Sequence, residues 1–115
     1  MTRVLVCGGR DFRDREAVFA SLDSLHAEHR FSVVIAGGSR GTDTLAADWA
    51  RERGVPTEVY RADWEHFGHK AGPLRNGRML AEGKPDLVVA FPGGKGTANL
   101  IEQARAAGVR VFLWS

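Results

Sequence analysis

Short apolar runs alternate along the chain with longer stretches in which apolar residues recur every three or four positions. The short runs favour buried β-strands, and the longer stretches favour helices with one apolar stripe. Five strands are predicted, at residues 3–7, 32–36, 57–60, 86–91 and 110–114. Four helices are predicted between them, at residues 14–29, 43–54, 73–82 and 97–107.

Capping residues indicate where the helices begin and end. Asp43 is predicted to cap the second helix, which ends at Gly54. Pro73 is predicted to occupy the first position of the third helix, and Thr97 to cap the fourth. A longer polar stretch, residues 61–72, separates the third strand from the third helix.

Strict alternation of strands and helices with short connections predicts one α/β domain spanning residues 1–115. Right-handed crossovers then give a doubly wound, five-stranded parallel sheet with the strand order 3-2-1-4-5. The run 86–91 is almost entirely apolar and is predicted to be central. The run 57–60 is short and less apolar, as an edge strand would be.

Three predicted strands end in a pair of glycines with a cation close behind. The pairs are Gly8-Gly9, Gly37-Gly38 and Gly93-Gly94, and the cations are Arg10, Arg40 and Lys95. Loops that follow parallel strands lie at one edge of the sheet, where helix N-termini and glycine backbones favour anions. We therefore expect the loops to gather around a nucleotide-like, phosphorylated small molecule.

The residues predicted to bind this ligand come from the three loops and from the start of the third helix. They are Gly8, Gly9, Arg10, Asp11, Gly37, Gly38, Ser39, Arg40, Gly41, Thr42, Asp43, Lys70, Arg75, Asn76, Pro92, Gly93, Gly94, Lys95, Gly96 and Thr97. Arg75 has two interpretations, a bidentate phosphate clamp or a residue on a solvated helix face. Trp64 has two as well, stacking on a base or packing in a core or interface.

Composition narrows the class of protein further. The net charge is only +2, and the cations are spread along the chain, which makes a nucleic-acid partner unlikely. No apolar run is long enough to cross a membrane, and the single cysteine, Cys7, favours a cytoplasmic setting. His66 and His69 lack a firm third ligand, so no metal and no cofactor are expected.

Two familiar phosphate-binding motifs do not fit. Strand one ends in Gly8-Gly9-Arg10-Asp11 rather than G-x-G-x-x-G, and no acidic residue ends strand two. The segment 93–97 has the wrong spacing for a P-loop. A dinucleotide-dependent dehydrogenase and a Walker-type NTPase are therefore disfavoured.

Several motifs together resemble the SLOG superfamily, the SMF/DprA–LOG group, and more closely its YspA/cpYpsA-related family. They are Gly8-Gly9-Arg10-Asp11-Phe12, Gly37-Gly38 with Arg40-Gly41-Thr42-Asp43, Ala62-Asp63-Trp64, Lys70-Ala71-Gly72-Pro73 with Arg75-Asn76, and residues 91–97. The resemblance implies a Rossmann-like fold of bacterial or phage origin that binds a nucleotide or nucleotide derivative. It also implies a homo-oligomer, a dimer or higher.

The LOG-type phosphoribohydrolases of this superfamily carry the motif P-G-G-x-G-T-x-x-E, in which the Glu is catalytic. This chain has Leu100 at that position. Glu102 is two residues on, about 200° around the helix, and should face elsewhere. If the protein is an enzyme, the acids that could replace the missing Glu are Asp11, Asp43, Asp63 and Glu65.

Three functions are consistent with these residues. The first is a sensor or binding domain for a nucleotide-derived ligand. The second is an enzyme, either an N-glycosidase of the phosphoribohydrolase type or another hydrolase acting on a nucleotide. The third is binding of single-stranded DNA, which is known for related SMF/DprA proteins.

Overall fold

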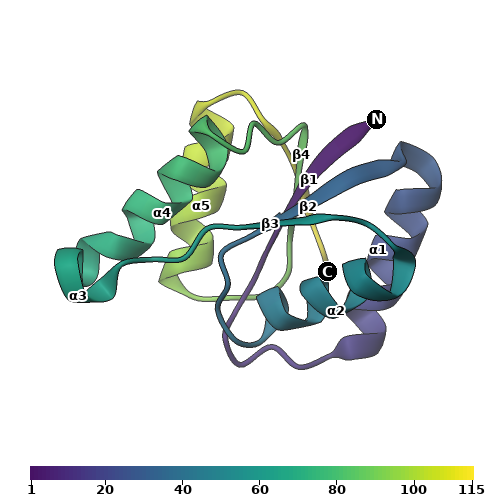
Figure 1. The fold of residues 1–115 in the computed structure, drawn as a ribbon, viewed down its shortest axis with the longest axis horizontal. Helices are drawn as coiled ribbons and strands as arrows, with labels where there is room; N and C mark the ends of the chain where they lie inside the picture. The colour runs from purple at the N-terminus through teal and green to yellow at the C-terminus, as the bar shows by residue number, and fades with distance from the viewer.

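Five parallel strands form one sheet in the order β3-β2-β1-β4-β5 in the computed structural model, which describes all 115 residues (Figure 1). The strands are β1 (Thr2–Cys7), β2 (Phe31–Ala36), β3 (Thr57–Val59), β4 (Leu87–Ala90) and β5 (Arg110–Leu113). All neighbouring strands pair in parallel. The predicted strand order is confirmed, with the short β3 at one edge.

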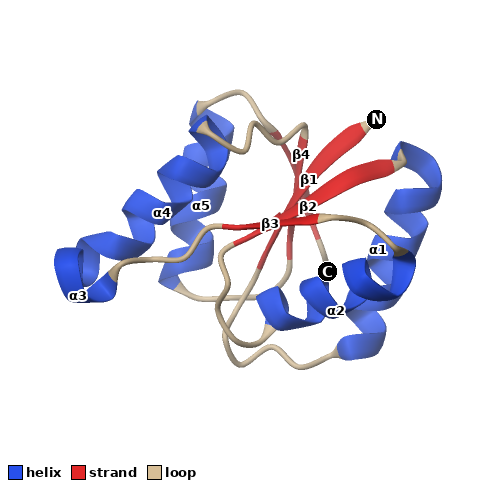
Figure 2. Ribbon diagram, in the orientation of Figure 1, coloured by secondary structure: helices blue, strands red, loops and turns tan.

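Helices cover both faces of the sheet (Figure 2). On one face lie α1 (Arg15–His29) and α2 (Thr42–Arg53), and on the other lie α4 (Ala71–Ala81) and α5 (Lys95–Ala106). The polar stretch before α4 contains a short helix, α3 (Trp64–Phe67), and a 3-10 turn, η1 (Gly68–Lys70). None of these helices has the length and apolar character needed to cross a lipid bilayer.

The side chains of β1 alternate between two hydrophobic cores, because successive residues of a strand point to opposite faces. Val4 and Val6 pack with α1 and α2 around Trp49, which is completely buried. Leu5 and Cys7 pack with α4 and α5. The doubly wound architecture thus follows directly from the apolar character of both faces of the central strands.

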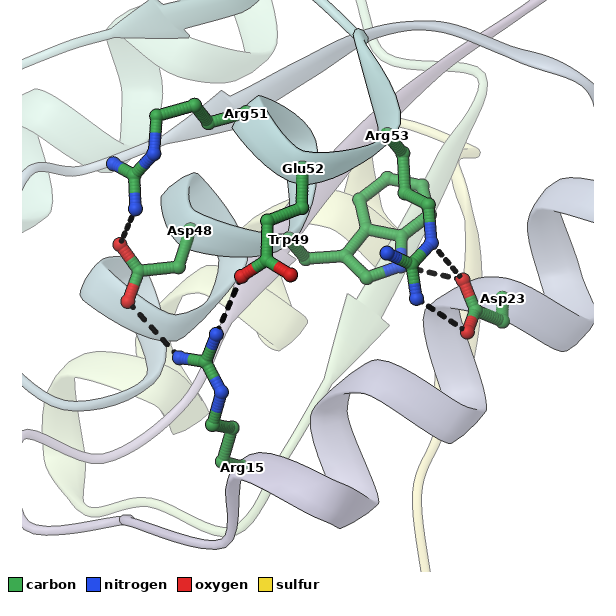
Figure 3. Close-up of polar contacts among 7 residues, drawn as sticks. All are labelled: Arg15, Asp23, Asp48, Trp49, Arg51, Glu52 and Arg53. Atoms are coloured by element: carbon green, nitrogen blue, oxygen red, sulfur yellow. Dashed lines mark hydrogen bonds and ion pairs between the residues drawn. The ribbon is translucent and has the colours of Figure 1, made fainter.

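Ion pairs tie α1 to α2 on the outside of the first core (Figure 3). The Arg15 guanidinium lies 3.2 Å from the Asp48 carboxylate and 2.6 Å from that of Glu52. The Asp23 carboxylate accepts hydrogen bonds from Trp49 Nε1 at 2.9 Å and from Arg53 Nε at 2.8 Å. These contacts join a buried aromatic side chain to surface charges on both helices.

Three predicted helix starts are wrong. Helix α2 begins at Thr42 with Gly41 as its N-cap, and the Asp43 carboxylate accepts a hydrogen bond from Ser39 N in the preceding loop instead of capping the helix. Helix α4 continues directly from the 3-10 turn, which places Pro73 at its third position, where an N–H has no intrahelical partner. Helix α5 begins at Lys95, two residues before Thr97.

Candidate functional site

The loops that follow β1, β2 and β4 meet at the carboxyl edge of the sheet (Figure 1). Gly9 N donates a 2.8 Å hydrogen bond to Pro92 O in the loop after β4. Gly9 O accepts hydrogen bonds from Thr42 N at 3.2 Å and from Thr42 Oγ1 at 3.1 Å. The loop after β1 is therefore the centre to which the other two are attached.

A cleft of about 570 Å³ opens between these loops and the helices α4 and α5. Its floor is apolar, made by Cys7, Met79 and Leu100. Its walls carry three cations, Arg10, Arg75 and Lys95. A smaller cleft of about 370 Å³ adjoins the first, and the two share Arg10, Gly37, Ser39, Trp64 and Arg75.

Most of the predicted ligand-binding residues line one of these clefts. The larger cleft is lined by Gly8, Gly9, Arg10, Gly37, Ser39, Asp43, Arg75, Asn76, Gly94, Lys95, Gly96 and Thr97. The smaller cleft adds Gly38 and Arg40. Six predicted residues line neither cleft: Asp11, Gly41, Thr42, Lys70, Pro92 and Gly93.

Four of these six residues either bond the loops to one another or leave room for their close approach. Thr42 is fully buried and donates hydrogen bonds to Gly9 O. On the other side of the same residue, Pro92 O accepts a hydrogen bond from Gly9 N. A Cβ atom on Gly41 would collide with the carbonyl oxygens of residues 9 and 10. A Cβ atom on Gly93 would collide with Thr97 Oγ1. These residues support the site without facing it.

Among the acidic candidates, only Asp43 lines a cleft. Asp11 is exposed and pairs with Arg40 at 3.3 Å. The Asp63 carboxylate caps α3 by accepting from His66 N at 3.1 Å. Glu65 is exposed on α3. Asp43 is thus the single carboxylate positioned to reach a molecule bound in the cleft.

Asp43 lies in an environment that favours its neutral form. Burial raises the pKa of its carboxyl group, while the N–H groups of Ser39 and Gly37 and the positive charge of Arg75 oppose the rise. Burial, with a smaller effect from the Asp43 charge, raises the pKa of the Cys7 thiol to about 12. The thiol at the floor of the cleft is therefore neutral and unreactive.

Arg75 is held in the cleft wall, so its interpretation as a solvated surface residue is wrong. Its Nη1 donates to Gly37 O at 2.7 Å, and its Nε donates to Asn76 Oδ1 at 3.0 Å. Burial lowers the pKa of its guanidinium. The charge of Asp43 opposes this decrease, and the charge of Arg10 reinforces it. No carboxylate pairs with Arg75, Arg10 or Lys95.

A chain of amides joins α4 to α5 beside the cleft. Asn76 Nδ2 donates to Gly96 O at 3.2 Å and to Asn99 Oδ1 at 3.1 Å, and Gln103 Nε2 donates to the same Asn99 oxygen at 2.7 Å. These bonds fix the first turn of α5 against α4. Asn99 lines the cleft and was not predicted from the sequence, because its position follows from a hydrogen bond with Asn76, 23 residues earlier.

Trp64 lies at the junction of the two clefts and is 46% exposed. The Arg10 guanidinium lies 5.3 Å from the centroid of its ring, a cation–π distance. His69 also lines the larger cleft, whereas His66 does not. The chain has no group of three or more His, Cys, Asp and Glu side chains that could hold a metal ion.

Leu100 is 1% exposed and forms part of the cleft floor. Glu102 is exposed and lines neither cleft, as its position on the helix predicted. The place where related hydrolases would carry a carboxylate is therefore occupied by an apolar side chain.

A doubly wound parallel sheet with glycine-rich loops at its carboxyl edge defines a Rossmann-like protein. Comparison with known proteins gives the family: residues 2–67 match the model of the YspA, cpYpsA-related SLOG family, and the chain belongs to this family. It is 44% identical to the Gene 61 protein of Mycobacterium phage D29, over 97% of this chain and 95% of that protein.

Among solved structures, the fold is similar to that of DNA processing protein A (DprA) from Streptococcus pneumoniae. The TM-score is 0.76 at 22% sequence identity, over 98% of this chain. The match covers 50% of the DprA chain, so this chain spans about half the length of that protein. At this level of identity the likeness concerns the fold.

Proposed function

We propose that the larger cleft binds a nucleotide or nucleotide-derived phosphorylated ligand and that the protein is a sensor or binding domain for it. One observation carries the proposal: Arg10, Arg75 and Lys95 line the cleft without a carboxylate partner. Arg75 is partly buried and is repelled by the positive charge of Arg10, and an anion would relieve that repulsion. Family membership supports the same class of ligand.

The N-terminus of α5 is the best place for a phosphate. Gly94 caps this helix without a side-chain hydrogen bond, so the first N–H groups are free for a ligand. A Cβ atom on Gly94 or Gly96 would meet nothing within 4 Å, so open space lies beside both residues. Lys95, between them, adds a positive charge.

The rest of the cleft suits a nucleoside. The apolar floor offers a surface for a flat base, and Asn99 beside it offers an amide for hydrogen bonding. The exposed ring of Trp64 can stack on a base at the junction of the clefts. A ligand that combines phosphate and base would use each part of this lining.

A thermal-shift titration of the full chain with AMP, ADP, NAD and cyclic di-AMP tests the proposal. A ligand present at 100 times its Kd stabilises the fold by about 2.7 kcal/mol, which raises Tm by several degrees for a domain of this size. The absence of a shift with every compound at millimolar concentration would contradict the proposal.

Gly94→Val provides the site-specific variant for this titration. The open space beside Gly94 means that the fold tolerates the side chain, while the isopropyl group occupies the phosphate position. We expect an unchanged Tm without ligand and loss of the ligand-induced shift. Ala98→Val, exposed on the same helix and outside both clefts, is the matched control and should keep the shift.

Hydrolysis of the ligand is the second candidate function, and the partly buried Asp43 is the observation that favours it. A carboxyl group with a raised pKa can serve as a general acid or base. Incubation with AMP, NAD and cyclic di-AMP, followed by chromatography, should then release base or phosphate. Release that persists in Asp43→Asn would exclude this residue, and no release would leave binding as the function.

The fold shared with DprA is the reason for a further experiment, a gel-shift assay with single-stranded DNA. We expect no gel shift with a 20-nucleotide oligonucleotide at low salt, since the cations line a cleft rather than a continuous groove.

Homo-oligomerisation stays a prediction, for which Trp64 and Phe67, 46% and 47% exposed, are the candidate contacts. Analytical ultracentrifugation of the same sample measures it.

A further inference from the structure

The smaller cleft is lined by four arginines and no acidic residue. The arginines are Arg10, Arg40, Arg61 and Arg75, and the cleft opens into the larger one through the residues that both share. Among these four, only Arg40 has a carboxylate partner, the exposed Asp11 at 3.3 Å. Such a concentration of positive charge is unexpected in a protein whose net charge is only +2.

Two of these arginines are fixed by successive carbonyl groups of the loop after β2. Arg75 Nη1 donates to Gly37 O at 2.7 Å, and Arg61 Nη1 donates to Gly38 O at 3.0 Å. A guanidinium has five N–H donors, and these side chains use two and one of them within the protein. The remaining donors are held in place and free to bind a ligand.

The glycine pair makes this arrangement possible. A Cβ atom on Gly37 would collide with Arg75 Nη1. Gly38 has a φ of +75°, and a Cβ atom there would lie 3.0 Å from Arg61 Nη1. The pair that the sequence suggested as a ligand-binding loop thus allows two guanidinium groups to approach the backbone closely.

From this arrangement we propose that the smaller cleft is a second anion subsite, and that the ligand carries two separated phosphate groups. The inference rests on the proposed function, because it places the first phosphate at the N-terminus of α5 in the larger cleft. The second phosphate lies beyond Trp64, between the guanidinium groups of Arg61 and Arg75. The ligand class is a nucleoside bisphosphate or a dinucleotide rather than a nucleoside monophosphate.

Calorimetric titration of the full chain with AMP, adenosine 3′,5′-bisphosphate and the dinucleotide pApA tests this proposal. At least one of the two bisphosphorylated probes should bind about tenfold more tightly than AMP, the gain expected from charge-assisted hydrogen bonds. In Arg61→Ala this advantage over AMP should fall to about twofold or less. Arg61→Gln, which keeps the first part of the side chain and a polar end but removes the positive charge, should behave like Arg61→Ala.

Arg13→Ala is the matched control, because Arg13 is exposed, makes no ion pair and lines neither cleft. It should keep the full advantage. The subsite is disproved if AMP binds and neither bisphosphorylated probe binds more tightly, or if the advantage survives both Arg61 substitutions. If AMP and both probes fail to bind while another nucleotide of the thermal-shift titration binds, the subsite alone is disproved. If none of these compounds binds, the proposed function fails, and the subsite that rests on it fails too.

Discussion

Three arginines of α1 and α2 and the two arginines that line the larger cleft have opposite surroundings. On the α1–α2 side, Arg15, Arg51 and Arg53 each pair with a carboxylate, as Figure 3 shows. On the cleft side, Arg10 and Arg75 pair with none. The same residue type therefore forms ion pairs within and between helices on one side and presents unused donors in the cleft.

Two aspartates differ in the same way. Hydrogen bonds from Arg53 lower the pKa of the Asp23 carboxyl group, on the α1–α2 side. Burial raises the pKa of the Asp43 carboxyl group, in the cleft. A paired charge stabilises the folded state, whereas an unpaired cation or a buried carboxylate destabilises it. The charges of the α1–α2 side shown in Figure 3 are paired within the protein, whereas the cations Arg10, Arg75 and Lys95 of the cleft have no carboxylate partner, as the proposed anion site requires.

Trp49→Ala should have the largest effect on stability. Trp49 is fully buried, and its Nε1 donates to Asp23 Oδ1 at 2.9 Å, so the substitution removes a large core side chain and a hydrogen bond. We expect a loss of about 3–5 kcal/mol in the free energy of unfolding, measured by urea denaturation. Trp64→Ala, on the cleft side, should cost less than about 0.5 kcal/mol. Similar losses for both would contradict the division of roles.

Arg75→Ala should affect binding more than stability. It removes two hydrogen bonds within the protein but also relieves repulsion from Arg10, so Tm should change little. Affinity for adenosine 3′,5′-bisphosphate or pApA, whichever binds the wild type more tightly, should fall by roughly ten- to a hundredfold, equivalent to about 1.5–3 kcal/mol. Calorimetric titration measures the affinity. Arg78→Ala, on the same helix but paired with Glu82 at 3.0 Å, is the control and should keep it. Unchanged affinity in Arg75→Ala would show that the cation does not contact the ligand.

Arg15→Ala should give the reverse result on a smaller scale. Its two ion pairs are partly exposed, so their loss should lower the free energy of unfolding by at most about 1 kcal/mol. Its guanidinium also lies 4.2 Å from the centroid of the Phe19 ring, a contact that alanine removes. Affinity for AMP should not change. Weaker binding in this variant would mean that the two sides are coupled.

The fold could be predicted almost completely from the sequence, because strand order depends on patterns that are local. Runs such as 86–91 mark buried strands, and short connections leave few topologies. The meeting of the loops could be predicted for the same reason, since loops after parallel strands share an edge. Which side of a loop faces the cleft could not be predicted.

Side-chain direction in the loops depends on contacts between distant parts of the chain. Lys70 and Asp11 are charged residues within the motifs that predicted the site, yet neither lines a cleft. Arg61 was not predicted, because its position follows from a hydrogen bond to Gly38 O, 23 residues earlier. Asn99 enters through contacts with another helix. A single sequence contains no local signal for such pairs.

Asp43→Asn should sharpen the comparison through its pH dependence. A carboxyl group whose pKa is higher in the folded protein than in the unfolded chain stabilises the fold when protonated, and this contribution is lost as pH rises through the folded pKa. At pH 7 the variant should therefore be slightly more stable than the wild type, and the difference should vanish toward pH 3.5. Asp23→Asn should show the opposite sign, because its lowered pKa stabilises the fold above the unfolded pKa, and that contribution is lost on acidification. Urea denaturation from pH 3.5 to 7 measures both. If the free energy of unfolding of the two variants depended on pH in the same way, the Asp43 carboxylate would be stabilised within the protein, as that of Asp23 is. It would then not be available to a ligand.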